Sequence, residues 1–378
     1  MVMFGKSIKL FRLLDFEVRV DVSWLVLAVL VTWTLAVGLF PYRYEGLEKT
    51  VYWWMGVIGA VGLFFSILFH EFCHSLVARK FGIPMRGITL FIFGGVAEMD
   101  DEPPSPKAEF LMAAAGPLSS MALGTLFFVL ASPMRGSPTA LAVYGVLSYL
   151  STINWILAGF NLVPAFPLDG GRILRAALWH WKRDLRGATR ISSRIGSGFG
   201  IFLMLSGALS ILLGNVIGGL WQFMIGMFLR SAAESGYRQI VFRKALEGDT
   251  VERFMNNRPV TAPPSISIRE LVEEYIYRYH FKMFPVTEGD KLMGCITTRR
   301  VKEIPRQEWD RKTVSDQIDR CSSENTIAPG VGALQALTLM SRTKNSRLMV
   351  VVGDRLVGII SLKDILGYLS LKSELGDE

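Results

Sequence analysis

Residues 51–74, VYWWMGVIGAVGLFFSILFHEFCH, join an uncharged apolar run directly to a cluster of ionisable side chains. The run from 51 to 69 is about long enough to cross a hydrocarbon core of roughly 30 Å as a helix. Ionisable groups are costly at membrane depth, and where they occur they usually line a pathway or a site. The stretch therefore predicts a membrane helix that carries chemistry at one end.

The cluster, His70-Glu71-Phe72-Cys73-His74, has the HExxH spacing. Positions i and i+4 of a helix share a face, so His70 and His74 can direct their imidazole nitrogens at one metal ion. Glu71 lies beside them, where a general base can take a proton from water at a hydrolytic zinc site. The alternative is a polar helix end at the membrane interface, where snorkelling lowers the cost of burial.

A hydrolytic zinc site needs a third protein ligand, and residues 161–172, NLVPAFPLDGGR, contain the strongest candidate. Pro164 and Pro167 disfavour helix at the residues before them, and irregular backbone at membrane depth is tolerated where it lines a protein cavity. Asp169 is therefore the predicted third ligand of one zinc ion per chain. Alternatively, it serves only as the N-cap of a helix that begins near Gly171.

The composition supports a membrane protein, since 51% of the 378 residues are hydrophobic and 20% are charged. The first apolar run is too long, and lacks the cleavage site, for a removed signal peptide. Six transmembrane helices are predicted, at about 22–40, 51–69, 110–133, 138–163, 196–214 and 216–230, with a tight Gly214-Asn215 turn between the last two.

Lys and Arg residues are distributed unequally among the loops, and they concentrate on the cytoplasmic side of membrane proteins. We therefore expect a multi-pass protein of the cell membrane, embedded in the lipid bilayer, with its N-terminus and polar C-terminal tail in the cytoplasm. The basic segments hold Lys6, Lys9, Arg12, Arg19, Arg79, Lys80, Arg86, Lys107, Arg172, Arg175, Lys182, Arg183, Arg186, Arg190 and Arg194, and the intervening loops hold Arg43, Lys49 and Arg135.

The formal net charge of +8 is attributed to this orientation bias, so no nucleic-acid partner is predicted. The three cysteines are too few and too scattered for a disulfide framework.

The two motifs together resemble the site-2 protease family of intramembrane zinc proteases, whose pattern is HExxH followed by NxxPxxPLDG. Both are matched without a substitution, within a resemblance that covers most of the chain before about residue 235. The resemblance implies His70, His74 and Asp169 as zinc ligands. It also implies Glu71 as the general base and Asn161 as an oxyanion or substrate contact.

Residues 87–97, GITLFIFGGVA, form an apolar stretch too short to span a membrane. The residues alone indicate a buried strand with a turn at Gly94-Gly95. The stretch is also similar to the family's membrane-embedded β-hairpin. A substrate helix must unwind to reach a metal site, and an exposed strand edge can pair with its freed amides. Ala115-Gly116-Pro117 resembles a further family feature, although small residues there also permit close helix packing.

A repeat is visible after about residue 240, where short β-rich runs alternate with amphipathic segments. Residues 284–297, FPVTEGDKLMGCIT, parallel residues 349–361, MVVVGDRLVGIIS. Each copy predicts a strand, a turn, a strand and then a helix. The repeat resembles tandem cystathionine-β-synthase-type (CBS) domains, which pair as an α/β module and often bind adenosine nucleotides between copies.

In the CBS family a Ser or Thr followed three positions later by Asp contacts the nucleotide. Ser361 and Asp364 fit this pattern in the second copy. In the first copy Thr297 is a further candidate for a nucleotide contact, but Arg300 replaces the acid, which leaves phosphate binding there as an alternative and favours one nucleotide site over two. The expected regulator is an adenine nucleotide such as ATP or AMP. Alternatively, the module only pairs two chains in a homodimer or stabilises a closed state.

We therefore expect a transmembrane metalloprotease domain at 1–238 and a cytoplasmic tandem CBS module at 239–378, with copies at about 249–306 and 312–372. The predicted fold is a multi-pass α-helical membrane protein with about six transmembrane helices and a membrane-embedded β-hairpin, followed by an α/β module. The predicted function is cleavage, within the membrane, of a single-span anchored protein. The alternatives are a CBS-gated transporter or channel, which does not explain a Glu between two metal ligands, and a catalytically silent scaffold.

Overall fold

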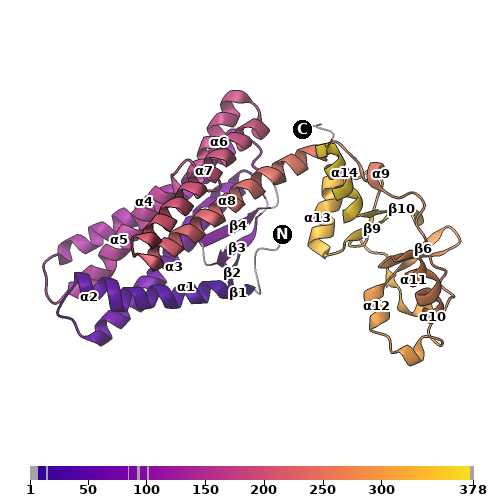
Figure 1. Ribbon diagram of the computed structural model, residues 1–378, viewed down its shortest axis with the longest axis horizontal. Helices are drawn as coiled ribbons and strands as arrows, with labels where there is room; N and C mark the ends of the chain where they lie inside the picture. The colour runs from indigo at the N-terminus through magenta and orange to yellow at the C-terminus, as the bar shows by residue number, and fades with distance from the viewer. Residues whose placement is uncertain (1–6, 14–15, 84, 92–93, 100–101, 375–378) are drawn as a thin grey trace. The chain divides into compact units, whose positions relative to one another are not determined.

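The computed structural model describes residues 7–13, 16–83, 85–91, 94–99 and 102–374. Contacts within the chain divide it between Ile240 and Val241 into two units, which Figure 1 shows and which are described separately below.

The first unit begins with two strands and continues mainly as long helices. Its elements are β1 (Ser7–Leu13), β2 (Phe16–Asp21), α1 (Val22–Trp33), a π-helical segment (Thr34–Leu39), α2 (Phe40–Arg43), α3 (Lys49–Lys80), β3 (Met85–Phe91), β4 (Gly94–Met99), α4 (Pro106–Ala131), a 3-10 turn (Ser132–Met134), α5 (Leu141–Asn161), α6 (Asp169–Lys182), α7 (Leu185–Leu212) and α8 (Val216–Ala245).

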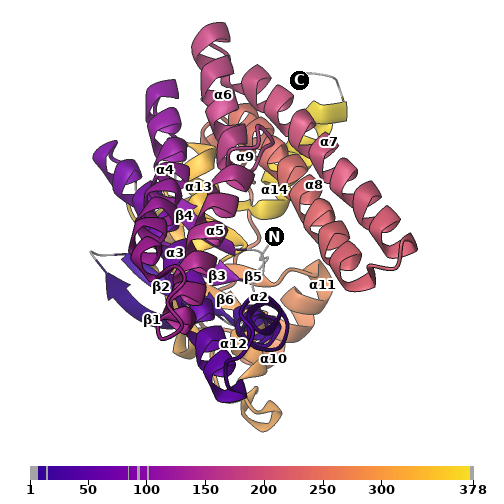
Figure 2. The ribbon, with the colours of Figure 1, turned by 90° about the vertical axis from the view of Figure 1, so that its left-hand side faces the viewer.

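Six helical segments in the described part of the chain are long and apolar enough to cross a membrane, which confirms the predicted number. They are Val22–Arg43, Lys49–Lys80, Pro106–Met134, Leu141–Asn161, Leu185–Leu212 and Val216–Ala245. The second segment continues well beyond residue 69, so the HExxH sequence lies inside the helix rather than at its end. Gly214 takes a φ of +94° in the predicted tight turn, and α7 and α8 lie side by side (Figures 1 and 2).

The predicted hairpin is part of a four-stranded sheet with the order β1-β2-β3-β4. β2 pairs with β3 in parallel, and the other two pairs are antiparallel. The predicted turn at Gly94-Gly95 is wrong, because both glycines belong to β4 and Gly94 pairs with Phe91; the connection falls at 92–93, outside the described residues. The sequence analysis also missed β1 and β2, although the alternation of apolar and charged residues in FEVRVD has the period of a half-buried strand.

The second unit is an α/β module. Its elements are α9 (Val251–Phe254), α10 (Ile268–Glu270), a π-helical segment (Leu271–Ile276), α11 (Tyr277–Tyr279), β5 (Met283–Glu288), β6 (Lys291–Thr297), α12 (Thr298–Lys302), 3-10 turns at Arg306–Glu308 and Val314–Gln317, β7 (Asp319–Arg320), β8 (Thr326–Ile327), α13 (Ala333–Thr343), β9 (Arg347–Val352), β10 (Arg355–Ser361) and α14 (Leu362–Glu374).

The strands of this module form one sheet with the order β5-β6-β10-β9-β8, and β7 pairs with β6. The predicted order of strand, turn, strand and helix is confirmed in both copies, as β5-β6-α12 and β9-β10-α14. Each copy has its own apolar core, with Phe284 and Ile296 in the first and Leu348 and Ile360 in the second, all at most 1% exposed. The repeat therefore folds as two similar halves.

Candidate metal centre

Two histidines of α3 and the first residue of α6 converge on one point, and we call His70, His74 and Asp169 the triad. Their side chains are buried, with 3%, 8% and 9% of each residue exposed. Nε2 of His70 lies 3.1 Å from Nε2 of His74 and 3.1 Å from Oδ2 of Asp169, and Nε2 of His74 lies 3.2 Å from the same oxygen. Residues separated by 95 and 99 positions thus offer three ligand atoms to one point.

The second nitrogen of each imidazole ring is fixed from α4. Nδ1 of His74 lies 2.6 Å from the carbonyl oxygen of Met112, which can only accept, so this nitrogen carries a proton. Nδ1 of His70 lies 2.9 Å from Oγ of Ser120. In the neutral imidazole a proton on Nδ1 leaves Nε2 with a lone pair, and this is the arrangement that metal-ligating histidines use.

Asp169 reaches the two histidines because the chain is not helical in the segment before it. α5 ends at Asn161, and the amide of Leu168 donates to the carbonyl oxygen of Ala165 at 2.9 Å in the loop that follows. α6 then begins at Asp169, with Leu168 as its N-cap. The alternative of Asp169 as an N-cap is therefore wrong, because the helix begins two residues before the predicted Gly171.

The backbone of Gly116 on α4 leaves open the space in front of the two imidazoles. A Cβ built on Gly116 would overlap Nε2 of His74 and lie 2.5 Å from Nε2 of His70. A methyl group at this point would occupy the space next to both Nε2 atoms, where zinc would be bound about 2.0–2.1 Å from each nitrogen. The residues of the triad therefore fit a zinc ion in donor type, in separation and in the room left between them.

Glu71 lies next to the triad on α3 and against strand β4. A Cβ built on Gly95 would lie 2.6 Å from Cγ, 3.0 Å from Cδ and 3.1 Å from Oε1 of Glu71. A glycine is thus required at this point of β4 for the strand to approach the carboxylate. The contact joins the predicted general base to the predicted hairpin.

The second unit contains the predicted nucleotide residues, and its two copies differ. Oγ of Ser361 donates to Oδ2 of Asp364 at 2.6 Å, and the amide of Ser361 donates to the same oxygen at 2.9 Å. In the first copy Oγ1 of Thr297 accepts from the amide of Arg300, whose guanidinium instead pairs with Glu303 at 3.1 Å. Only the second copy combines the hydroxyl with a carboxylate.

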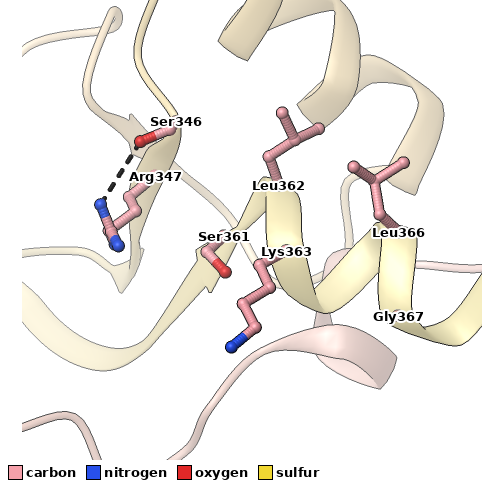
Figure 3. A pocket seen from close by; sticks show the side chains of 7 residues that line it. All are labelled: Ser346, Arg347, Ser361, Leu362, Lys363, Leu366 and Gly367. Carbon is pink, nitrogen blue, oxygen red and sulfur yellow. Dashed lines mark hydrogen bonds between the residues drawn. The ribbon is translucent and has the colours of Figure 1, made fainter. Parts of the chain in front are cut away.

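A pocket of about 530 Å³ lies beside the pair in the second copy. Its lining includes Ser361, Lys363 and Arg347, together with Leu362 and Leu366 of α14, and Figure 3 shows these side chains. The pocket thus offers two positive charges near a helix N-terminus, where anions are favoured.

Comparison with known proteins gives two family matches. The profile of Peptidase family M50 matches residues 58–142 and 133–206, and that of the CBS domain matches residues 251–305 and 321–371. Rip3 of Mycobacterium tuberculosis, whose name marks it as a candidate zinc metalloprotease, is 34% identical over 95% of this chain and 92% of its own.

The chain belongs to peptidase family M50.

Two of the comparisons give a match from Methanocaldococcus jannaschii. Zinc metalloprotease MJ0392 is 30% identical to this chain, covering 98% of it and 99% of MJ0392. The solved structure of a site-2 protease is 31% identical and covers 61% of this chain and 94% of its own, with a TM-score of 0.43. The M50 chain is thus an intramembrane zinc metalloprotease with paired CBS domains and a candidate zinc site in the triad, which confirms the predicted family and enzyme class.

Among the residues predicted for the M50 site, Asn161 differs in that its side chain bonds within its own helix. Its Nδ2 donates to the carbonyl oxygen of Leu157 at 3.0 Å, within its own helix. The sequence analysis missed Ser120, whose hydroxyl fixes the ring of His70. A signal was present, because Ser120 follows Gly116 by one helical turn and so lies on the same face of α4.

Proposed function

We propose that this M50 chain hydrolyses a peptide bond within the membrane-spanning segment of a single-span anchored protein. The observation that carries the proposal is the place of Glu71, which lies beside the triad and against β4 through Gly95. General base, candidate zinc ligands and a strand that can hold the substrate are thus adjacent.

Zinc bound by the triad would supply Lewis acidity at the scissile carbonyl and at the attacking water. Glu71 accepts the proton of that water and passes it to the nitrogen of the departing amine. Ser120 and the carbonyl of Met112 hold the two rings in the tautomer that directs Nε2 inward. Asn161 uses one amide hydrogen within α5 and keeps the second for a carbonyl oxygen of the substrate.

Strand β4 is the proposed binding edge for the unwound substrate. In the described part of the chain it pairs with β3 alone, so its other side offers backbone groups to an extended peptide. Pairing there satisfies the amides that the substrate loses when its helix unwinds, and it brings the scissile bond toward Glu71.

The loops rich in Lys and Arg support an orientation with the N-terminus and the CBS module in the cytoplasm, in the cell membrane. We further propose that an adenine nucleotide, ATP or AMP, binds at Ser361 and Asp364 and regulates cleavage. The pocket beside this pair, with Arg347 and Lys363, supports a phosphate-bearing ligand. Pairing of CBS modules in a homodimer is part of the same proposal.

The test is cleavage of a model single-span substrate in detergent, with the zinc content measured on the same samples. Glu71→Gln should keep zinc but slow hydrolysis by about 10²–10⁴-fold, the range that general acid–base groups contribute. Glu45→Gln, at an exposed position before α3, is the matched control and should cleave normally. Equal cleavage by wild type and Glu71→Gln would reject the proposed mechanism.

A further inference from the structure

Phe166 lies three residues before Asp169, and its surroundings come from three different helices. The residue is 7% exposed. Its backbone lies against Gly196 of α7, where an added Cβ would overlap the carbonyl oxygen of Phe166. Its ring lies against Gly236 of α8, where an added Cβ would overlap Cε1 and lie 2.9 Å from Cζ. Two glycines thus bring the backbones of α7 and α8 directly onto one residue of the loop.

A charged group of α6 also holds the ring. The guanidinium of Arg175 lies over Phe166, with Cζ 5.3 Å from the ring centroid. Arg175 is 3% exposed, and its Nε donates to Oε1 of Glu109 at 2.5 Å, while its Nη2 donates to Glu102 at 3.3 Å. Because Glu109 belongs to α4 and is fully buried, the ring is fixed relative to the helix that carries Gly116.

The segment between Phe166 and Asp169 has little freedom to absorb a displacement. Pro167 has a fixed φ and cannot donate a hydrogen bond. The amide of Leu168 bonds back to the carbonyl of Ala165, and the carbonyl of Leu168 accepts from the amide of Arg172 at 3.1 Å. A shift of Phe166 must therefore be passed on to the first residue of α6.

α7 and α8 lie in close contact, which leaves little room for one helix to shift without the other. A Cβ on Gly200 would lie 2.7 Å from the carbonyl oxygen of Gly226, and one on Gly207 would lie 2.7 Å from that of Gly219. Such small-residue contacts allow membrane helices to approach closely. α8 then continues without interruption to Ala245, past the division between the two units.

We propose that Phe166 is a positioning residue for Asp169, and that it makes the geometry of the triad depend on the position of α8. The inference rests on the proposed role of Asp169 as a zinc ligand. α8 is the helix that leads into the CBS module, so a force on its C-terminal end reaches the metal centre through Gly236 and Phe166. The cytoplasmic module thereby has a mechanical route to one metal ligand.

The experiment introduces one methyl group at the contact in the full-length protein in detergent. Gly236→Ala places that methyl group against the ring and should weaken zinc affinity by about 10- to 100-fold, the range seen for partners of metal ligands. It should lower kcat more than it changes KM, and shift the absorption bands of the cobalt-substituted protein. Gly198→Ala on α7, where a Cβ meets open space, is the matched control and should leave all three unchanged.

A second substitution distinguishes positioning from simple destabilisation. Phe166→Leu shortens the side chain, so the double variant Phe166→Leu/Gly236→Ala should bind zinc as tightly as Phe166→Leu alone. Additive losses in the double variant would overturn the inference. So would a Gly236→Ala protein with a lower Tm but the zinc affinity, kcat and cobalt spectrum of the control.

Asp169→Ala, measured alongside, separates this inference from the function on which it rests. If Asp169→Ala retains wild-type zinc affinity, the proposed ligand role fails and the inference fails with it. If Asp169→Ala loses zinc while Gly236→Ala behaves as the control, only the role of Phe166 is rejected.

Discussion

The triad and the Ser361–Asp364 pair both consist of ligand-binding groups, but their polar atoms are satisfied differently. In the triad, Nε2 of His70, Nε2 of His74 and Oδ2 of Asp169 face one another at 3.1–3.2 Å, in a buried site, while α4 occupies both Nδ1 atoms. In the second CBS copy, the carboxylate of Asp364 accepts two hydrogen bonds from Ser361, three residues away. That pair is exposed to solvent.

The two sites differ in whether the residues alone indicate a ligand. Three ligand atoms that converge in a buried site, two from imidazoles and one from a carboxylate, suit a cation that would be bound by all three. The Ser361–Asp364 pair forms the reciprocal bonds of a helix N-terminus and is satisfied without any ligand. Geometry alone therefore indicates a metal at the first site, whereas the second needs the neighbouring charges of Arg347 and Lys363 to indicate a ligand.

The largest expected effect tests whether the space between the histidines is the metal position. Gly116→Ala would put a methyl group there. Zinc affinity should fall by more than the roughly 10–100-fold that is lost when a residue hydrogen-bonded to a metal ligand is replaced, and cleavage should be lost. Zinc binding is measured by competition with a chelator. Gly159→Ala on α5, where a Cβ meets nothing within 4 Å, is the control. Normal zinc content in Gly116→Ala would show that the metal lies elsewhere.

A smaller effect tests whether α4 holds the ring of His70. Ser120→Ala removes the oxygen that lies 2.9 Å from Nδ1, and zinc affinity should weaken by about 10-fold with the fold intact. Ser151→Ala is a matched control, since that buried hydroxyl also bonds to another helix, at the carbonyl of Gly124. If both variants bind zinc equally well, the ring is oriented without Ser120.

The smallest effect tests the second region of the comparison. Asp364→Asn keeps the size of the side chain and an acceptor for Ser361 but removes the charge that strengthens a hydrogen bond from a hydroxyl of the nucleotide, so ATP or AMP affinity should fall about 10-fold. Thr297→Ala in the first copy should change affinity by less than about twofold, because Arg300 there pairs with Glu303. Titration calorimetry on the full-length protein measures both. Equal losses in the two variants would indicate two nucleotide sites rather than one.

The sequence predicted the parts of the fold that follow from local pattern. Uncharged runs identified the six long apolar helices of the described residues, since runs of this length are typical of helices that cross a hydrocarbon core. The repeat around Gly289 and Gly353 identified two strand pairs, and both glycines take a positive φ in their turns. Errors occurred where local signals compete, as at Gly94-Gly95, where glycines that resemble a turn instead allow β4 to approach Glu71.

The sequence by itself determined that His70 and His74 can face one metal ion, because helix periodicity places positions i and i+4 on one face, and that Glu71 lies beside them on the same turn. It also determined that the helix is interrupted around Pro164 and Pro167 before Asp169, since proline restricts the backbone wherever it occurs. Only the tertiary structure decided that Asp169 meets the histidines, that Gly116 leaves room between them and that Phe166 lies against Gly236. These contacts join residues far apart in the chain, and they depend on how the helices pack, which no local pattern encodes.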